Sequence, residues 1–128
     1  IRIHGRFPAR ALRLGPEDEI PGAMIQWMEW NLRGRWVGND GTDYQQRFAD
    51  LDVPTFFLAG AGDKLFAPPY ACRALFDMIG SDEKAFLLCG RRTGFSHDYG
   101  HAGLLVHRSA RIEVWPRILA WIQARILH

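Results

Sequence analysis

The sequence has little cysteine and no long apolar run. Its 128 residues include two cysteines, Cys72 and Cys89, whose spacing matches neither a Cys-x-x-Cys motif nor a metal site. This pattern favours two small buried side chains in a reduced, cytoplasmic protein. The longest apolar run, residues 53–62, is shorter than the roughly 18 residues that a membrane-spanning helix needs. We therefore expect no membrane span.

An excess of charge of one sign is also missing. Sixteen Lys and Arg against fourteen Asp and Glu leave a net charge of +2, and no basic run could follow a phosphate backbone. We therefore expect no binding to nucleic acid. The apolar content of 48% and the aromatic content of 12% are typical of a globular chain, and the length allows one domain.

Residues 1–50 are interrupted by proline and glycine and contain one clear helical pattern. Over Pro21–Arg33 the apolar residues that recur at helical spacing are Met24, Met28 and Leu32, with Trp27 beside them. Pro21 suits the first position of this helix and Gly34 suits its C-terminal cap. A second short helix is expected around Tyr44–Phe48. We interpret this half as a small helical insertion rather than an independent core.

Residues 51–128 predict a different architecture, in which strands and helices alternate. Two short apolar strands, residues 53–60 and 84–89, are each followed by an amphipathic helix, residues 68–79 and about 112–127. This alternation predicts a parallel α/β sheet. Two strands alone would leave open edges, so we expect the sheet to be completed elsewhere. A missing part of a longer chain is favoured over a homodimer formed through the open edge.

A polar side chain follows each predicted strand. Asp63 ends the turn Gly-Ala-Gly-Asp after the first strand, and His101 lies in the loop after the second. In open α/β sheets, ligands bind at this rim. An acid and a histidine in this order are the last two members of an acid–base–nucleophile arrangement. A turn-forming aspartate and a surface histidine are the alternatives at this point.

These motifs resemble the C-terminal part of an α/β-hydrolase. The resemblance rests on Gly-Ala-Gly-Asp followed by Pro68-Pro69, on Tyr-Gly-His at residues 99–101, and on the apolar helix that contains residues 114–122. It implies that Asp63 is the triad acid, that His101 is the general base, and that no metal or cofactor takes part. Residues 1–50 then occupy the place of the cap or lid that this family inserts, and residues 51–128 form the end of the core.

The resemblance also implies a reaction class. The expected activity is hydrolysis of a carboxylic ester, as in esterases and lipases, with a small apolar ester or acyl group as substrate. An acyltransferase and a non-catalytic interaction module built on the same fold are the alternatives.

The chain departs from the family at the nucleophile. The family places this residue on a Gly-x-Ser-x-Gly elbow ahead of the acid, and none of Ser81, Ser96 and Ser109 lies in such a motif or precedes Asp63. We therefore expect the nucleophile (Ser, Cys or Asp) and the oxyanion hole to lie upstream in a longer enzyme, and this chain alone to be inactive. A sequence that begins without methionine fits this expectation.

Two other interpretations concern the segment around His101. Asp98 is a rival for the acid, but it stands only three residues before His101, so Asp63 is favoured. The run from His97 to His101 resembles the His-Glu-x-x-His metal motif, with His107 as a third ligand. Aspartate is shorter than the required glutamate, and a glycine interrupts the required helix. We therefore expect no metal.

Three aromatic residues are candidates for substrate binding: Trp27, Trp30 and Phe66. Other apolar residues of the first half could line the same acyl pocket beneath the cap, namely Phe7, Met24, Met28 and Trp36. The alternative, which we favour for the residues of the first half, is that they pack the cap helix against the core.

Overall fold

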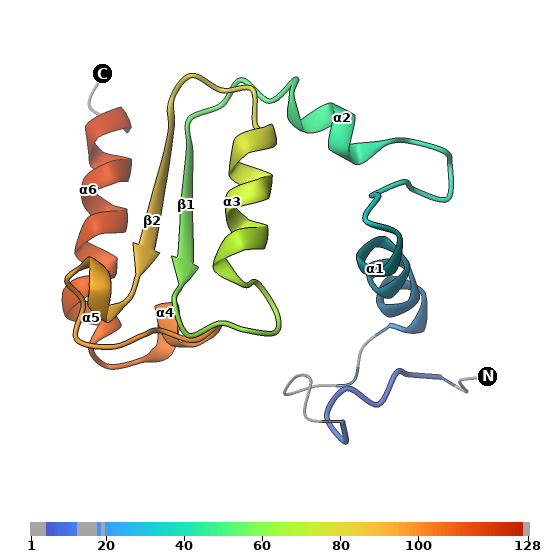
Figure 1. Ribbon diagram of the computed structural model, residues 1–128, viewed down its shortest axis with the longest axis horizontal. Coiled ribbons are helices and arrows are strands. Elements are labelled where there is room, and N and C mark those ends of the chain that lie inside the picture. The colour runs from blue at the N-terminus through green and yellow to red at the C-terminus, as the bar shows by residue number, and fades with distance from the viewer. Residues whose placement is uncertain (1–4, 13–17, 19, 127–128) are drawn as a thin grey trace. The chain divides into compact units, whose positions relative to one another are not determined.

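The computed structural model describes residues 5–12, 18 and 20–126, and the chain divides into two compact units after Arg47. The elements of the chain are drawn in Figure 1. Within the described ranges, no helix combines the length and the apolar character needed to cross a membrane.

The first unit contains the predicted helix α1, Pro21–Arg33. Proline stands in its first turn, and Gly34 closes it in the left-handed conformation at φ 61°, so both predicted ends are confirmed. Helix α2 covers Tyr44–Phe48, as predicted. Of the apolar stripe on α1, Met28 and Leu32 are exposed.

The second unit is built on a parallel pair of strands. Strand β1, Thr55–Gly60, pairs with β2, Lys84–Cys89, in the register Thr55↔Lys84 to Gly60↔Cys89. Helix α3, Pro69–Met78, connects the two strands, and α6, Trp115–Ile126, ends the described chain. Figure 1 shows β1 and β2 running in the same direction between these two helices. The predicted α/β class is confirmed for this unit.

Two consecutive side chains of β1 contact helices on opposite faces of the sheet. Phe56 stacks on Trp121 of α6, with ring centroids 5.4 Å apart, whereas Phe57 makes an edge contact with Phe76 of α3 at 5.6 Å. Because successive side chains of a strand point to opposite faces, α3 and α6 cover the two faces of the sheet. This explains why the strands read as continuous apolar runs rather than as alternating ones.

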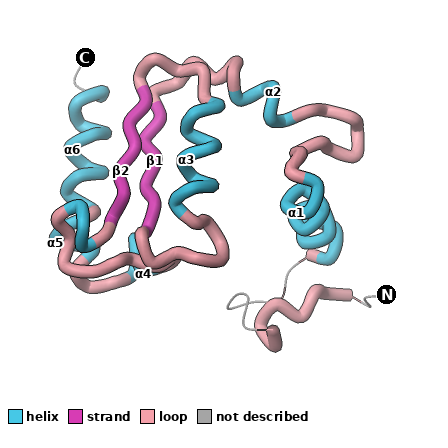
Figure 2. Tube along the Cα trace, viewed as in Figure 1, coloured by secondary structure: helices cyan, strands magenta, loops and turns pink. Residues whose placement is uncertain are grey.

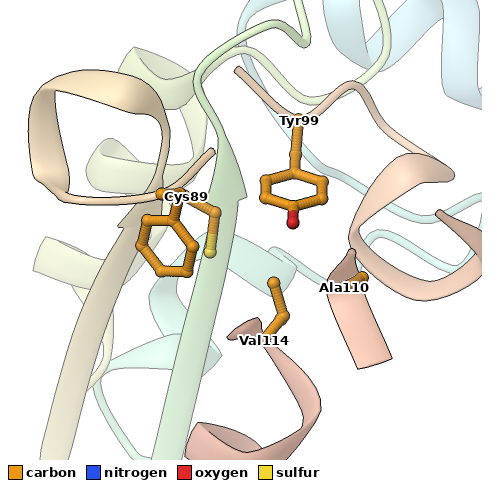
Figure 3. Packing of buried hydrophobic residues seen from close by; sticks show 5 residues of the cluster. Cys89, Tyr99, Ala110 and Val114 are labelled. Carbon is orange, nitrogen blue, oxygen red and sulfur yellow. The ribbon is translucent and has the colours of Figure 1, made fainter. Parts of the chain in front are cut away.

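A buried cluster packs the segment that follows β2 against the sheet. Its members are Cys89, Phe95, Tyr99, Ala110 and Val114, four of which are labelled in Figure 3. Leu58 of β1 and Ile118 of α6 pack around it. The predicted burial of Cys89 is confirmed, whereas Cys72 on α3 is only half-buried.

Three predicted boundaries shift by one or two residues: the start of β1 and both ends of α3, which begins at Pro69 rather than at Pro68. Strand β1 begins at Thr55 rather than at Val53, because Pro54 has no N–H to donate to a neighbouring strand. Helix α3 ends at Met78, and Ile79 is extended and buried.

The predicted final helix is two helices. A short helix α5, Ala110–Glu113, is separated from α6 by Val114. Pro116 cannot donate the backbone hydrogen bond that would continue α5 into α6, so the break is local in origin. Residue Leu127, expected at the end of this helix, lies outside the described residues.

The predicted loop between β2 and the last helices contains two short helical turns. The 3₁₀ helix η1, Arg91–Thr93, follows β2, and the helix α4, Gly103–Val106, follows His101.

The outer edge of β1 has no neighbouring strand among the described residues. Pairing of this edge with a further part of a longer chain, or with a second copy, stays a prediction.

Candidate functional site

The loops that follow β1 and β2 meet at the carboxyl end of the sheet and bring Asp63 and His101 together. Figure 2 shows both loops at that end of the strands. The Nδ1 atom of His101 lies 2.8 Å from Oδ2 of Asp63, although 38 residues separate them in the sequence. The parallel register explains this contact, because it places Gly60 beside Cys89 at the last pair of the two strands.

Asp63 is buried and is held by the main chain that follows it. Its side chain is 4% exposed. The oxygen Oδ1 accepts hydrogen bonds from the N–H groups of Leu65 and Phe66, and Oδ2 accepts one from Ala67. Asp63 is therefore a turn-forming residue and the partner of His101 at the same time.

These hydrogen bonds decide the protonation state of Asp63. Burial by itself raises the pKa of a carboxyl group, but the hydrogen bonds from Ala67, from His101 and from the other two N–H groups outweigh it. The pKa of Asp63 is consequently below its ordinary value, so the carboxylate is ionised at neutral pH.

The contact with Asp63 uses one ring nitrogen of His101 and leaves the other, Nε2, without a hydrogen-bond partner among the described residues. Its side chain is 58% exposed, and the ring of Phe66 lies beside it with centroids 5.4 Å apart. With Nδ1 donating to the ionised Asp63, the neutral imidazole carries a free lone pair on Nε2. No described residue forms a hydrogen bond with Nε2. This is the arrangement that general base catalysis requires.

Two glycines allow the loops to approach this closely. A Cβ atom on Gly60 would stand 2.2 Å from the carbonyl oxygen of Tyr99, and one on Gly62 would stand 2.5 Å from that of Asp98. The N–H of Gly62 also donates to the Tyr99 carbonyl at 2.9 Å. The two glycines of the Gly-Ala-Gly-Asp motif are therefore needed for contact between the two loops.

A cleft of about 280 Å³ opens beside the pair. Asp63 and His101 form part of its wall, and the rest is apolar: Leu58, Ala59, Gly60, Ala67, Leu104, Leu105 and Ile118. The cleft therefore combines one acid–base pair with an apolar lining, which is the usual composition of a small-molecule site.

The rival acid, Asp98, does not contact His101. Its Oδ1 atom accepts a hydrogen bond of 2.9 Å from the N–H of Arg91 at the start of η1. The structure thus brings Asp63 and His101 together. Asp98 instead stabilises the turn that follows β2.

The three histidines of the alternative metal site are divided between two places. The rings of His97 and His107 lie 4.5 Å apart, whereas His101 is paired with Asp63. In the described part of the chain, no three His, Cys, Asp or Glu side chains are grouped so that they could hold a metal ion.

None of the three serines is hydrogen-bonded to His101. The Ser96 hydroxyl contacts Nδ1 of His97, the Ser81 hydroxyl accepts the N–H of Glu83, and the N–H of Ser109 donates to His107.

The candidate substrate-binding aromatics are in different units. Phe66 lies at the site, beside His101. Trp30 belongs to the first unit, where its ring stacks on Trp36 at 5.8 Å and its Nε1–H donates to the Val37 carbonyl. Trp27 is exposed on α1. Trp30 therefore packs within the first unit, and the role of Trp27, Trp30 and Phe66 in substrate binding stays a prediction.

The low pKa of Asp63 predicts an acid-dependent loss of stability. The unfolded carboxyl binds a proton at a higher pH than the folded one, so the contribution of Asp63 is complete above its unfolded pKa of about 3.9. It is lost as the pH falls through the folded value. Urea unfolding between pH 5 and pH 2 should show a shallower decline in stability for Asp63→Asn than for the unsubstituted protein. Asp77→Asn on α3, which removes an exposed carboxylate, is the control, and equal declines for Asp63→Asn and the unsubstituted protein would contradict the prediction.

One curated protein is similar to this chain. It is the poly(3-hydroxyalkanoate) polymerase subunit PhaC of Haloarcula marismortui, which is 29% identical over 116 residues. The match covers 88% of this chain and 22% of that protein, so the chain spans about a fifth of the length of this relative. The similarity supports an α/β-hydrolase-like relationship.

No family model matches the chain. No solved structure matches it significantly either.

Proposed function

We propose that this chain carries the acid and the general base of an acyl-transfer active site, and that the reaction is hydrolysis of a carboxylic ester. The observation that carries the proposal is the 2.8 Å contact between His101 Nδ1 and the buried Asp63 carboxylate at the carboxyl ends of two parallel strands. The α/β-hydrolase-like relationship gives this contact its chemical context.

The proposed chemistry follows from the free nitrogen of His101. With a Ser or Cys nucleophile, Nε2 takes the proton of that nucleophile as it attacks the ester carbonyl, and gives this proton to the leaving alcohol. Nε2 then takes a proton from the water that cleaves the acyl-enzyme and returns it to the nucleophile, which releases the carboxylic acid. Asp63 holds the imidazole in the tautomer with hydrogen on Nδ1 and stabilises the imidazolium that forms. This proposal uses no metal and no cofactor.

The nucleophile in this proposal is a Ser, Cys or Asp outside the 128 residues. Ser81, Ser96 and Ser109 make their hydrogen bonds away from His101. Residues 1–128 alone are accordingly proposed to be inactive, and the oxyanion hole is proposed to come with the nucleophile.

The lining of the cleft supports an apolar acyl substrate. Apart from Asp63 and His101, its wall consists of apolar residues and glycine, and Phe66 lies against the His101 ring. A small aliphatic or aromatic acyl group would bury apolar surface there while its carbonyl faces the acid–base pair. In this proposal residues 1–50 serve as the cap.

A second candidate is acyl transfer to an acceptor other than water. The similar protein is a subunit of a poly(3-hydroxyalkanoate) polymerase, and its name supports transfer to a hydroxyl group. The same pair of residues would serve, because the imidazole can take its second proton from an alcohol as well as from water.

Labelling with a fluorophosphonate probe tests the proposal in the complete protein. A serine other than Ser81, Ser96 and Ser109 should be labelled, and His101→Ala should slow the labelling by about 10²- to 10⁴-fold. A chromogenic acyl ester, assayed with and without an added alcohol, then separates hydrolysis from transfer. Ester turnover without labelling would point to a nucleophile other than serine. Absence of both labelling and ester turnover would favour a non-catalytic module.

A further inference from the structure

A carboxylate outside the acid–base pair holds the segment that leads to His101. Glu113, the last residue of α5, accepts two hydrogen bonds on the same oxygen, Oε2. One comes from the N–H of Ser96 at 3.1 Å, and the other comes from the hydroxyl of Tyr99 at 2.9 Å. A single oxygen atom therefore ties both ends of residues 96–99 to α5.

Tyr99 connects this carboxylate to the loop that carries Asp63. Its side chain is 2% exposed and packs among Cys89, Ala110 and Val114, as Figure 3 shows. Its carbonyl oxygen accepts the N–H of Gly62, one residue before Asp63. Tyr99 is thus held at its side chain by α5 and at its main chain by the loop after β1.

The Tyr99 hydroxyl keeps its proton at neutral pH and donates it in the hydrogen bond to Glu113. Burial and the hydrogen bond to Glu113 both raise the pKa of Tyr99 above its ordinary value, so the proton stays on the hydroxyl.

His101 has few contacts of its own to determine where its ring lies. More than half of its side chain is exposed, and its described partners are Asp63 and Phe66. Gly100, which precedes it, has no side chain that could hold the ring in place. The main chain at Tyr99 is the nearest rigid point before the imidazole.

We propose that Glu113 and Tyr99 are positioning residues, which hold the His101 imidazole in line with Asp63. The proposal rests on the catalytic role proposed above for Asp63 and His101. Without the Tyr99–Glu113 hydrogen bond, the Tyr99 side chain loses its polar attachment to α5, and the imidazole two residues later samples orientations in which Nδ1 does not face the carboxylate. A displacement on the order of 1 Å at a reacting group costs about 10²-fold in rate.

Kinetics of the complete enzyme test the proposal. Tyr99→Phe and Glu113→Ala should each lower kcat by about 10- to 100-fold and leave KM unchanged. Combined with Asp63→Asn, either change should cause little further loss, because its effect passes through the same pair. Ile79→Ala, a buried site at the end of α3, is the control for lost stability and should leave kcat unchanged. A full additional loss in the Asp63→Asn background would overturn the proposal.

A spectroscopic readout separates this proposal from the proposed function. The Nδ1–H proton of His101, protected by Asp63, should give a proton NMR signal in the unsubstituted protein and in Ile79→Ala, and should be lost in Tyr99→Phe and Glu113→Ala. A signal that persists in the last two variants, or is absent from the unsubstituted protein, refutes positioning. If the signals behave as expected but Asp63→Asn remains active, positioning stands and the proposed function fails.

Discussion

Asp63→Asn is expected to reduce kcat for ester cleavage by about 10⁴-fold in the complete protein. The amide removes the negative charge that stabilises the imidazolium of His101. It also turns an N–H group toward Nδ1 or presents a weaker acceptor, so the tautomer with a free lone pair on Nε2 is no longer favoured. Steady-state kinetics on the purified variant, with its folding checked by circular dichroism, measure the effect.

Asp98→Asn is the matched control for this experiment. The same chemical change is made at a carboxylate that lies in the same region but accepts the N–H of Arg91 instead of contacting His101. Because an asparagine carbonyl can still accept that hydrogen bond, kcat should change little. A large loss in Asp98→Asn together with an active Asp63→Asn would assign the acid to Asp98 and refute the proposed pair.

Gly60→Ala is expected to destabilise the protein by about 3 kcal/mol, at the upper end of the usual cost of overpacking. The new Cβ would stand 2.2 Å from the Tyr99 carbonyl oxygen, which is main chain and cannot move away as a flexible side chain does. Separation of the two loops would also break the hydrogen bond from Gly62 to Tyr99. Urea unfolding followed by circular dichroism gives the change in the free energy of unfolding.

Gly100→Ala provides the comparison for Gly60→Ala. It adds the same methyl group to the glycine that directly follows Tyr99, where nothing lies within 4 Å of the new atom. Its stability should stay within about 1 kcal/mol of the unsubstituted protein, since only the backbone entropy differs. Equal stability for Gly60→Ala and Gly100→Ala would show that the loops do not approach each other as described.

These two results bear on different parts of the proposal. Asp63→Asn tests the chemistry of the pair, whereas Gly60→Ala tests the close approach of the loops that creates the pair. If both variants lose activity and mainly Gly60→Ala loses stability, the results support a site that is assembled from two loops at the end of the sheet.

Local signals in the sequence were sufficient where local interactions decide the structure. Helix α1 begins at Pro21 and is closed by Gly34 because proline suits the first turn and glycine adopts the left-handed conformation at the end. The break at Val114 differs from the single helix that the sequence predicts, because the apolar periodicity continues through Pro116 although the hydrogen bonding does not.

The contribution of Glu113 could not be predicted in the same way. Its partners, Ser96 and Tyr99, precede it by 17 and 14 residues, and no periodicity relates such positions. A lone acid in an otherwise apolar and basic stretch was the only signal available. The structure assigns its partners because the core cluster packs α5 against the segment after β2.

Sequence patterns alone predict the alternation of strands and helices, the parallel direction of the strands, and the order of Asp63 and His101 along the chain. Apolar runs, prolines and glycines determine secondary structure over a few residues. The order of two residues along the chain is known without any structure. The folded chain is needed to show that Asp63, rather than Asp98, contacts His101, and that Tyr99 joins the two loops. Those contacts depend on the register of β1 on β2 and on side chains buried from distant segments, so they arise only when the sheet and its helices pack together.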